Sequence, residues 1–334
     1  MKAEGVELIE RIDKMAVMGF VEVLPRLPFL WALERKLVKT MDGLTPDLVV
    51  LIDYPGFNMR MARAARDRGL AVLYYITPQL WAWRPTRARR LAETVDRAAV
   101  ILPFEEGFLR ERGVDATYVG HPLLDRPDDV CSRNAFFDRW GLDPSRPILA
   151  MLPGSREQEL KYHLTAFSQI AARVLEKRPD VLPVFARAKQ LHAGPFLDSG
   201  HAVVDDSRTL LRYADAALVK SGTSTLEAAL EGTPFVTAYR MSEMTHRLAQ
   251  RLIEVDHISL PNLIVGARVV PEFIQDDVSA DRVAPVLLEL LDADSLARRQ
   301  QSEGFKQVRK SLGGAGASDR VAALAAELME GSPA

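Results

Sequence analysis

The stretch LVVLIDYPGFNMRMARAARDRGLAVLYYI (48–76) decides the fold that we predict. It opens with an apolar run at 48–53, continues through a helical pattern at 59–69 and ends in a second apolar run at 72–76. A strand, a helix and a second strand in this order form a βαβ unit, in which the two strands lie parallel. This unit therefore predicts an α/β protein that contains a parallel sheet.

The same alternation continues along the chain in two series. We expect the first series to add strands at 98–104 and 116–122, with helices at 85–95 and 105–113. The expected strands of the second series are 148–153, 182–187, 201–206, 216–222 and 234–240, separated notably by helices at 157–177 and 224–231. The turn-rich stretch 125–146 is the expected inter-domain region.

We therefore predict two Rossmann-like domains that face a cleft, with ligands at the carboxyl ends of the strands. The first domain is expected to span 1–140 and the second 141–312. Residues 313–334 are expected to form a C-terminal helix that crosses back or is exchanged in a homodimer.

Bulk properties exclude several classes of protein. A net charge of −2 gives no reason to expect a nucleic-acid partner. Cys131 is the only cysteine, which fits a reducing compartment, and no run of about 18 apolar residues indicates a membrane span. There is no His/Cys cluster and no P-loop, and the Asp292–Asp294 triplet lies in a helical segment. We expect neither a metal nor another cofactor.

The segment KSGTSTLEAALEGTP (220–234) carries the strongest local signal. A strand is expected to end at Lys220 and a helix to begin near Ser224, so that free N–H groups and the helix dipole would suit a diphosphate. Gly222 would let the phosphate approach the backbone, and Glu227 could accept hydrogen bonds from ribose hydroxyls. A capping box formed by Ser224 and Glu227 explains the same residues, and both interpretations stay open.

The segment LPGSREQE (152–159) has the same strand–glycine–helix plan. Arg156 is planar and always charged, which suits bidentate contact with phosphate. Ser155 and Gln158 also match a capping box, but such a cap does not require Arg156. The arginine therefore favours phosphate binding.

Three further polar residues follow expected strands or turns. Asp53 could act as a general base at the end of the strand at 48–53, although the spacing alone favours a cap or a bond to the Pro-Gly turn. His121 closes another strand, where a lone histidine is more often structural. Asn262 lies in a Pro-led turn and is, by itself, only a polar loop residue.

The stretch MAVMGFVEVLPRLPFLWALERKLVK (15–39) is dense in large apolar residues and has basic flanks. Such a patch suits a membrane interface or acyl chains. An ordinary helix buried against the sheet is the alternative, although Pro25 and Pro28 argue against one continuous core helix.

Together these motifs resemble the lipid-A-disaccharide synthase family of inverting GT-B glycosyltransferases. The matching segments run in the family's order across nearly the whole chain, and WAWR and SLPNL are the most specific. They are MAVMGFVEVL (15–24), IDYPGFN (52–58), TPQLWAWRPTR (77–87), LPFE (102–105), VGHPLLD (119–125), LPGSREQE (152–159), SGTSTLEAAL (221–230), YRMS (239–242) and SLPNLIVG (259–266).

The resemblance implies a reaction. The donor is a UDP-2,3-diacylglucosamine and the acceptor is a 2,3-diacylglucosamine 1-phosphate, whose 6-hydroxyl attacks the anomeric carbon with inversion. UDP and a β-1,6-linked lipid A disaccharide phosphate result. The enzyme would be cytoplasmic and peripheral to the inner membrane of a Gram-negative bacterium.

The resemblance also implies residue roles. Asp53 matches the family's essential aspartate and becomes the candidate base, and Asn262 matches an asparagine close to the donor. The expected donor-binding residues are Arg156, Ser221, Gly222, Thr223 and Ser224 at the diphosphate, Glu227 at the ribose, and His121. The expected acyl or membrane contacts are Met18, Phe20, Leu27, Phe29, Leu30 and Trp31.

One departure from the family pattern concerns the N-terminus. Family members begin with a further strand and a Gly-Glu-Ala-Ser-Gly-Asp-type loop, which the sequence from Met1 does not show. We therefore expect this chain to be unstable or inactive, and turnover comparable with that of an N-terminally extended version would contradict this. The alternatives are a UDP-N-acetylglucosamine 2-epimerase, which would leave the 15–39 patch unexplained, and a non-catalytic nucleotide-sugar-binding fragment.

Overall fold

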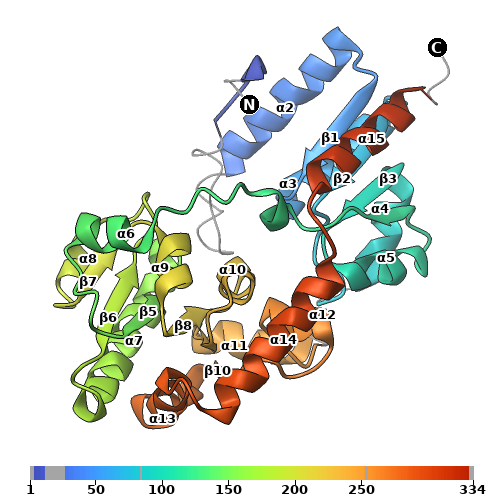
Figure 1. Cartoon of the computed structure of the whole chain (residues 1–334). Coiled ribbons are helices and arrows are strands. Elements are labelled where there is room, and N and C mark those ends of the chain that lie inside the picture. Colours follow the sequence, from blue (N-terminus) through green and yellow to red (C-terminus); the bar gives the residue numbers. More distant parts are fainter. Residues whose placement is uncertain (1–3, 12–26, 83–84, 253–254, 331–334) are drawn as a thin grey trace.

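The computed structural model describes residues 4–11, 27–82, 85–252 and 255–330, and its strands form two parallel sheets (Figure 1). The first sheet has the order β1-β2-β3-β4. Its strands are β1 (Leu48–Ile52), β2 (Ala71–Tyr75), β3 (Arg97–Val100) and β4 (Ala116–Tyr118). The helices between them are α3 (Pro55–Arg66), α4 (Ala88–Thr94) and α5 (Pro103–Arg110). The α/β class predicted from the sequence is confirmed.

Helices that are far apart along the chain cover the two faces of the first sheet. Because its strands are added in one direction, the right-handed crossovers bring α3, α4 and α5 to one face, where Tyr74 and Val100 pack with Leu91 and Leu109. The opposite face receives α15 (Ala317–Glu330), whose Leu324 packs on Leu73. The C-terminal helix therefore returns to the first sheet, as Figure 1 shows.

The second sheet has the order β10-β9-β8-β5-β6-β7. Its strands are β5 (Ile148–Leu152), β6 (Leu182–Ala186), β7 (Ala202–Val204), β8 (Ala216–Lys220), β9 (Phe235–Tyr239) and β10 (Glu272–Ile274). The chain adds β6 and β7 on one side of β5 and then crosses to place β8 on the other side. The carboxyl ends of β5 and β8 thus flank a topological switch point, where open α/β sheets bind ligands.

Helices cover both faces of this second sheet, so all five residues of β5 are buried. The helices of this domain are α6 (Arg133–Trp140), α7 (Glu157–Lys177), α8 (Gly194–Leu197), α9 (Ser207–Tyr213), α10 (Thr223–Glu231), α11 (Glu243–Leu252), α12 (Leu260–Val265), α13 (Ala280–Leu291) and α14 (Leu296–Leu312). Short 3-10 helices among the described residues of the chain include η4 (Pro85–Arg87), η5 (Pro122–Asp125) and η6 (Gln275–Asp277).

The domain boundary differs from the expected one at residue 140. Phe136 and Phe137 of α6 are buried with Ile148 and Val184 of the second sheet. The boundary therefore lies before α6, in the segment 126–132. Sequence periodicity missed this because α6 is only eight residues long and has no strand before it.

An apolar cluster joins the two domains. Leu102 and Phe104 of the first domain pack with Leu226 and Ile264 of the second. The hydroxyl of Tyr118 also donates to the carbonyl of Leu312, across 2.9 Å, at the end of α14. These contacts lie where the chain returns from α14 of the second domain to α15 on the first sheet.

Candidate functional site

The expected nucleotide crevice is the region at the carboxyl ends of β5 and β8, with the turns 153–156 and 221–222. Gly154 and Gly222 have φ values of 131° and 145°, which L side chains rarely adopt. A Cβ on Gly154 would lie 2.6 Å from an Oε atom of Glu159. Each glycine leads into a helix whose N-terminal N–H groups and dipole favour an anion.

Glu159 on α7 is bound by donors from the turn 153–156 and from the end of β8. Its Oε1 accepts from Lys220 Nζ at 2.8 Å and from Arg156 Nη1 at 3.0 Å, while Oε2 accepts from the Ser155 N–H at 2.8 Å. Burial alone would raise the pKa of Glu159, but these donors together hold it below its ordinary value. The carboxylate therefore stays charged.

Neither predicted capping box forms. Arg156 is the N-cap of α7, and the Ser155 N–H is bound by Glu159 instead. Gly222 is the N-cap of α10, without a side-chain cap, so Ser224 lies inside the first turn. The capping explanation of both motifs is therefore wrong. Thr223 is exposed and Ser224 is half-buried at the helix start.

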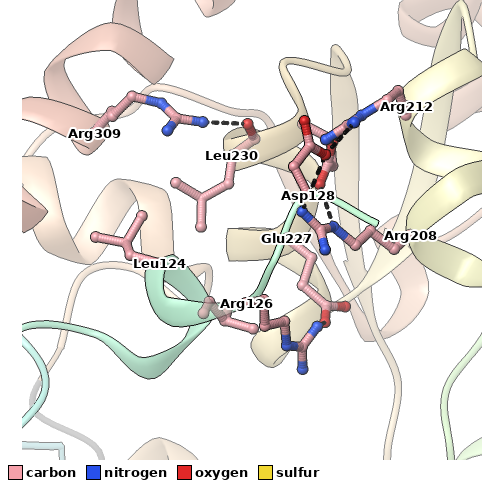
Figure 2. A pocket seen from close by; sticks show the side chains of 10 residues that line it. Leu124, Arg126, Asp128, Arg208, Arg212, Glu227, Leu230 and Arg309 are labelled. Atoms are coloured by element: carbon pink, nitrogen blue, oxygen red, sulfur yellow. Dashed lines mark hydrogen bonds and ion pairs between the residues drawn. The ribbon is translucent and has the colours of Figure 1, made fainter. Parts of the chain in front are cut away.

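Glu227 points into a cavity of about 270 Å³ between the inter-domain segment and α10 (Figure 2). Its Oε1 accepts from Arg126 Nη1 at 2.6 Å. Deeper along α10, Glu231 accepts from Arg208 and Arg212, at 2.7 Å each. Arg126 therefore fixes one oxygen of Glu227 and ties the inter-domain segment to the crevice.

Asn262 does not line the crevice, which corrects the expected contact with the donor. Its side chain is fully buried in α12. The amide oxygen accepts from the N–H groups of Val269 and Val270, and the amide nitrogen donates to the Val270 carbonyl and to Glu272. Both donors and both lone pairs of the amide are used, so Asn262 has no group left for a ligand.

Asn262 instead supports a loop that reaches Ser221. Glu272 on β10 accepts from the Ser259 N–H at 2.7 Å and from the Ile258 N–H at 3.1 Å. The Ile258 carbonyl in turn accepts from the Ser221 hydroxyl at 2.7 Å. Sequence reasoning missed Glu272 because β10 has only three residues and gives no periodic signal.

His163 links the crevice to the end of β9. Its Nδ1 lies 2.7 Å from the Glu159 carbonyl, and its Nε2 accepts from the Arg240 N–H at 2.9 Å. Burial lowers the pKa of His163 to about 4, so the ring is neutral at physiological pH. The sequence segment LPGSREQE ends four residues before His163, which is why the motif did not include it.

Asp53 follows β1 at the carboxyl edge of the first sheet and is exposed. Its backbone is held at φ 49° because its carbonyl accepts from Asn58 Nδ2 at 2.7 Å and from Tyr74 Oη at 2.9 Å. Tyr54 is the N-cap residue of α3, and α3 has no side-chain cap. Asp53 is therefore not the cap of α3, and its carboxylate is open to solvent.

His121 is buried and caps a short turn. Its Nδ1 accepts from the Leu123 N–H at 3.2 Å at the start of η5. Burial lowers the pKa of His121 to about 4, and the charge of Arg126 acts in the same direction. This buried ring shapes the domain junction through its Nδ1 bond, and the expected contact of His121 with the donor stays a prediction.

The WAWR and LPFE motifs meet in the first domain. Trp81 Nε1 donates to Glu105 Oε1 at 2.9 Å, and Glu105 also accepts from the Leu102 N–H at 2.9 Å. Burial raises the pKa of Glu105 to about 7 despite these donors. The pair supports the start of α5 at the inter-domain cluster.

The expected acyl-binding stretch divides into parts. Met18 and Phe20 lie outside the described residues. Leu30 is buried in the core of the first domain, so its expected role as an acyl contact is wrong. Leu27 and Phe29 are half-buried, and Trp31 is 52% exposed on α2 (Leu27–Leu44). No helix within the described ranges is both long and apolar enough to cross a bilayer.

A metal site is not evident in the described part of the chain. No group of three or more His, Cys, Asp or Glu side chains there could hold a metal ion.

Two parallel-sheet domains with a glycine turn on each side of the switch point place the chain in the GT-B class. UDP-GlcNAc 2-epimerase from Neisseria meningitidis bound to UDP-GlcNAc has a TM-score of 0.63 at 13% identity, and the match covers 89% of this chain and 81% of that chain. An Arabidopsis thaliana UGT complexed with UDP has a TM-score of 0.58 at 18% identity, covering 91% and 80%. At these identities the likeness concerns the fold alone.

The chain belongs to the lipid-A-disaccharide synthetase family, whose model matches residues 1–326. The lipid-A-disaccharide synthase of Geobacter sulfurreducens is 40% identical, covering 98% of this chain and 87% of the relative. That of Nitrosococcus oceani is 38% identical, covering 99% and 87%. The resemblance drawn from the motifs is thereby confirmed.

Proposed function

We propose that this protein transfers a 2,3-diacylglucosaminyl group from UDP to the 6-hydroxyl of 2,3-diacylglucosamine 1-phosphate, in lipid A biosynthesis. The products are UDP and a β-1,6-linked disaccharide 1-phosphate. The observation that carries the proposal is the nucleotide crevice at the β5/β8 switch point, in a chain that belongs to the lipid-A-disaccharide synthetase family.

The crevice supports binding of the donor diphosphate. The N-termini of α7 and α10 place N–H groups and positive dipole ends beside Arg156, Gly222, Thr223 and Ser224. Ser221 shapes the turn through its bond to the Ile258 carbonyl. Glu227 accepts hydrogen bonds from ribose hydroxyls through Oε2, because Arg126 binds Oε1.

Asp53 supplies the general base in this proposal. Its exposed carboxylate removes the proton from the acceptor 6-hydroxyl as that oxygen attacks the anomeric carbon. The bond from that carbon to the UDP oxygen breaks, and the departing diphosphate keeps the electron pair. Positive charge in the crevice stabilises that leaving group. A single displacement inverts the anomeric centre.

The exposed side of α2 supports contact with a membrane surface. Trp31, Arg35 and Lys39 are four residues apart and all exposed, so they form one stripe on the helix. An amphipathic indole beside two cations suits the interface of an anionic leaflet. We place the protein at the cytoplasmic face of the inner membrane of a Gram-negative bacterium, where its acylated substrates reside.

A homodimer that exchanges the C-terminal helix stays part of the proposal. Leu324 of α15 packs on Leu73 within one chain, and an exchanged helix would make the same contact with its partner. Light scattering at several protein concentrations measures this directly, and a monomer throughout would exclude the exchange.

The test of the function is acceptor dependence. Incubation with both acylated substrates in detergent, followed by mass spectrometry, should show one disaccharide formed for each UDP released. An epimerase would convert its nucleotide sugar without an acceptor, and a binding fragment would release no UDP. Either outcome would contradict the proposal.

A further inference from the structure

Lys220 occupies an unusual position for a lysine at a strand end. Its side chain is only 14% exposed, and its ammonium lies 5.3 Å from the centre of the Tyr239 ring. A Cβ built on Gly222 would be 3.4 Å from Lys220 Nζ, so the charge lies directly beside the glycine turn of the nucleotide crevice. Neither family resemblance nor strand periodicity assigned a role to this residue.

Lys220 pairs with the carboxylate of Glu159, which is bound by the same kinds of donor that bind phosphate. Glu159 accepts from an ammonium, a guanidinium and a backbone N–H at the start of α7. These three donor types are the ones that bind phosphate oxygens at helix N-termini. Two cations share one carboxylate, so the cluster of Arg156, Glu159 and Lys220 keeps one net positive charge.

We propose that Lys220 is a further binding residue for the donor diphosphate, and that Glu159 holds it in place until the nucleotide arrives. A diphosphate carries more negative charge than a carboxylate and offers more acceptor oxygens. The flexible lysine stem lets the ammonium turn from Glu159 Oε1 toward an anion above Gly222 without movement of β8. This inference rests on the proposed function, because it requires a nucleotide diphosphate in the crevice.

The cluster also explains why Glu159 is not simply a structural partner. Its charge opposes binding of a second anion, whereas the two cations favour it. Removal of the Lys220 charge should therefore weaken diphosphate binding, and removal of the Glu159 charge should not. A purely structural ion pair predicts instead that the two substitutions weaken binding equally.

The experiment is calorimetric titration of the full chain with UDP and with uridine, which lacks the diphosphate. Lys220→Met should reduce the affinity for UDP by about 10-fold or more, the usual effect of a lost charge-assisted hydrogen bond, while the affinity for uridine stays within about twofold. Lys220→Arg should recover most of the loss. Glu159→Gln should bind UDP at least as tightly as the parent protein. Exposed Lys161 on α7 is the control, because Lys161→Met changes the net charge of the protein by the same amount as Lys220→Met.

Three results would overturn the inference. They are unchanged UDP affinity in Lys220→Met, equal losses for UDP and uridine, or a loss in Glu159→Gln as large as that in Lys220→Met. Thermal melts of each variant identify misfolding, and Lys220→Gln, which also removes the charge, carries the test if Lys220→Met does not fold. Failure of the folded parent protein to bind UDP would reject the proposed function itself, and the inference with it.

Discussion

The amide nitrogen of Asn262 donates a hydrogen bond to Glu272 Oε1 at 2.9 Å. Through Glu272, the fully buried Asn262 side chain is connected to the loop that reaches the nucleotide crevice. The Asn262 side chain belongs to a motif that resembles a donor-binding segment, yet no atom of its amide is left to meet a donor. We therefore expect any effect of Asn262 on donor binding to pass through Glu272 and Ser221.

Asn262→Ala tests this indirect role. The substitution leaves the buried Val270 N–H without its acceptor and leaves the Val269 N–H with only the Ala267 carbonyl, so the free energy of unfolding should fall by about 2–4 kcal/mol. Urea denaturation measures the change. Asn134→Ala, at an exposed position of α6, is the control and should have little effect. A stable Asn262→Ala variant that had lost UDP binding would indicate direct contact with the donor.

Arg126→Gln tests whether the inter-domain segment orients Glu227. Without the guanidinium, the Glu227 carboxylate can rotate away from the ribose, and KM for the donor should rise by about 3- to 10-fold with a smaller change in kcat. Steady-state kinetics give both constants. Arg309→Gln changes another arginine of the same cavity and should leave KM for the donor near its original value. Equal KM values for the two variants would argue against the orienting role.

The neutral histidine at the crevice predicts a pH dependence of stability. An unfolded histidine titrates near 6.5, whereas burial lowers the pKa of folded His163 to about 4. Between these values the unfolded chain binds a proton that the folded protein does not, so the free energy of unfolding falls as the pH drops.

Urea denaturation between pH 7 and pH 4 measures this slope. His163→Gln keeps a side chain that can accept from the Arg240 N–H but cannot titrate, so its slope should be shallower. His121 retains its own share of the slope, because its pKa is lowered in the same direction. Exposed His192→Gln is the matched control. A His163→Gln slope identical to that of the parent would refute the assignment.

Two neighbouring residues of α2 separate membrane contact from folding. Trp31→Ala should weaken sedimentation with anionic phosphatidylglycerol vesicles and leave stability nearly unchanged, because the indole is 52% exposed. Leu30→Ala should lower the free energy of unfolding by about 2–4 kcal/mol through loss of core packing, with little effect on vesicle binding of the folded protein. Vesicle binding that does not depend on Trp31 would place the membrane-binding surface of the protein elsewhere.

Strand periodicity predicted the sheets well because the parallel strands appear as continuous apolar runs, as in ILAML of β5, which is buried throughout. It missed β10 and placed the boundary after α6, since short elements provide no period to detect. The glycine turns were predicted from the local order of strand, glycine and helix. The roles of Glu159 and Lys220 were not, because their contact joins residues 61 positions apart, and only the strand order at the switch point brings them together.

The measurement that tests the central claim most directly is UDP release with and without the acylated acceptor, by the parent protein and by Asp53→Asn. We expect release by the parent only when the acceptor is present, and this turnover would contradict the inactivity expected from the N-terminal sequence. We also expect that Asp53→Asn loses turnover but binds UDP with unchanged affinity, because the amide cannot take the proton of the 6-hydroxyl. Acceptor-independent turnover by the parent, or undiminished activity in Asp53→Asn, would contradict the central claim.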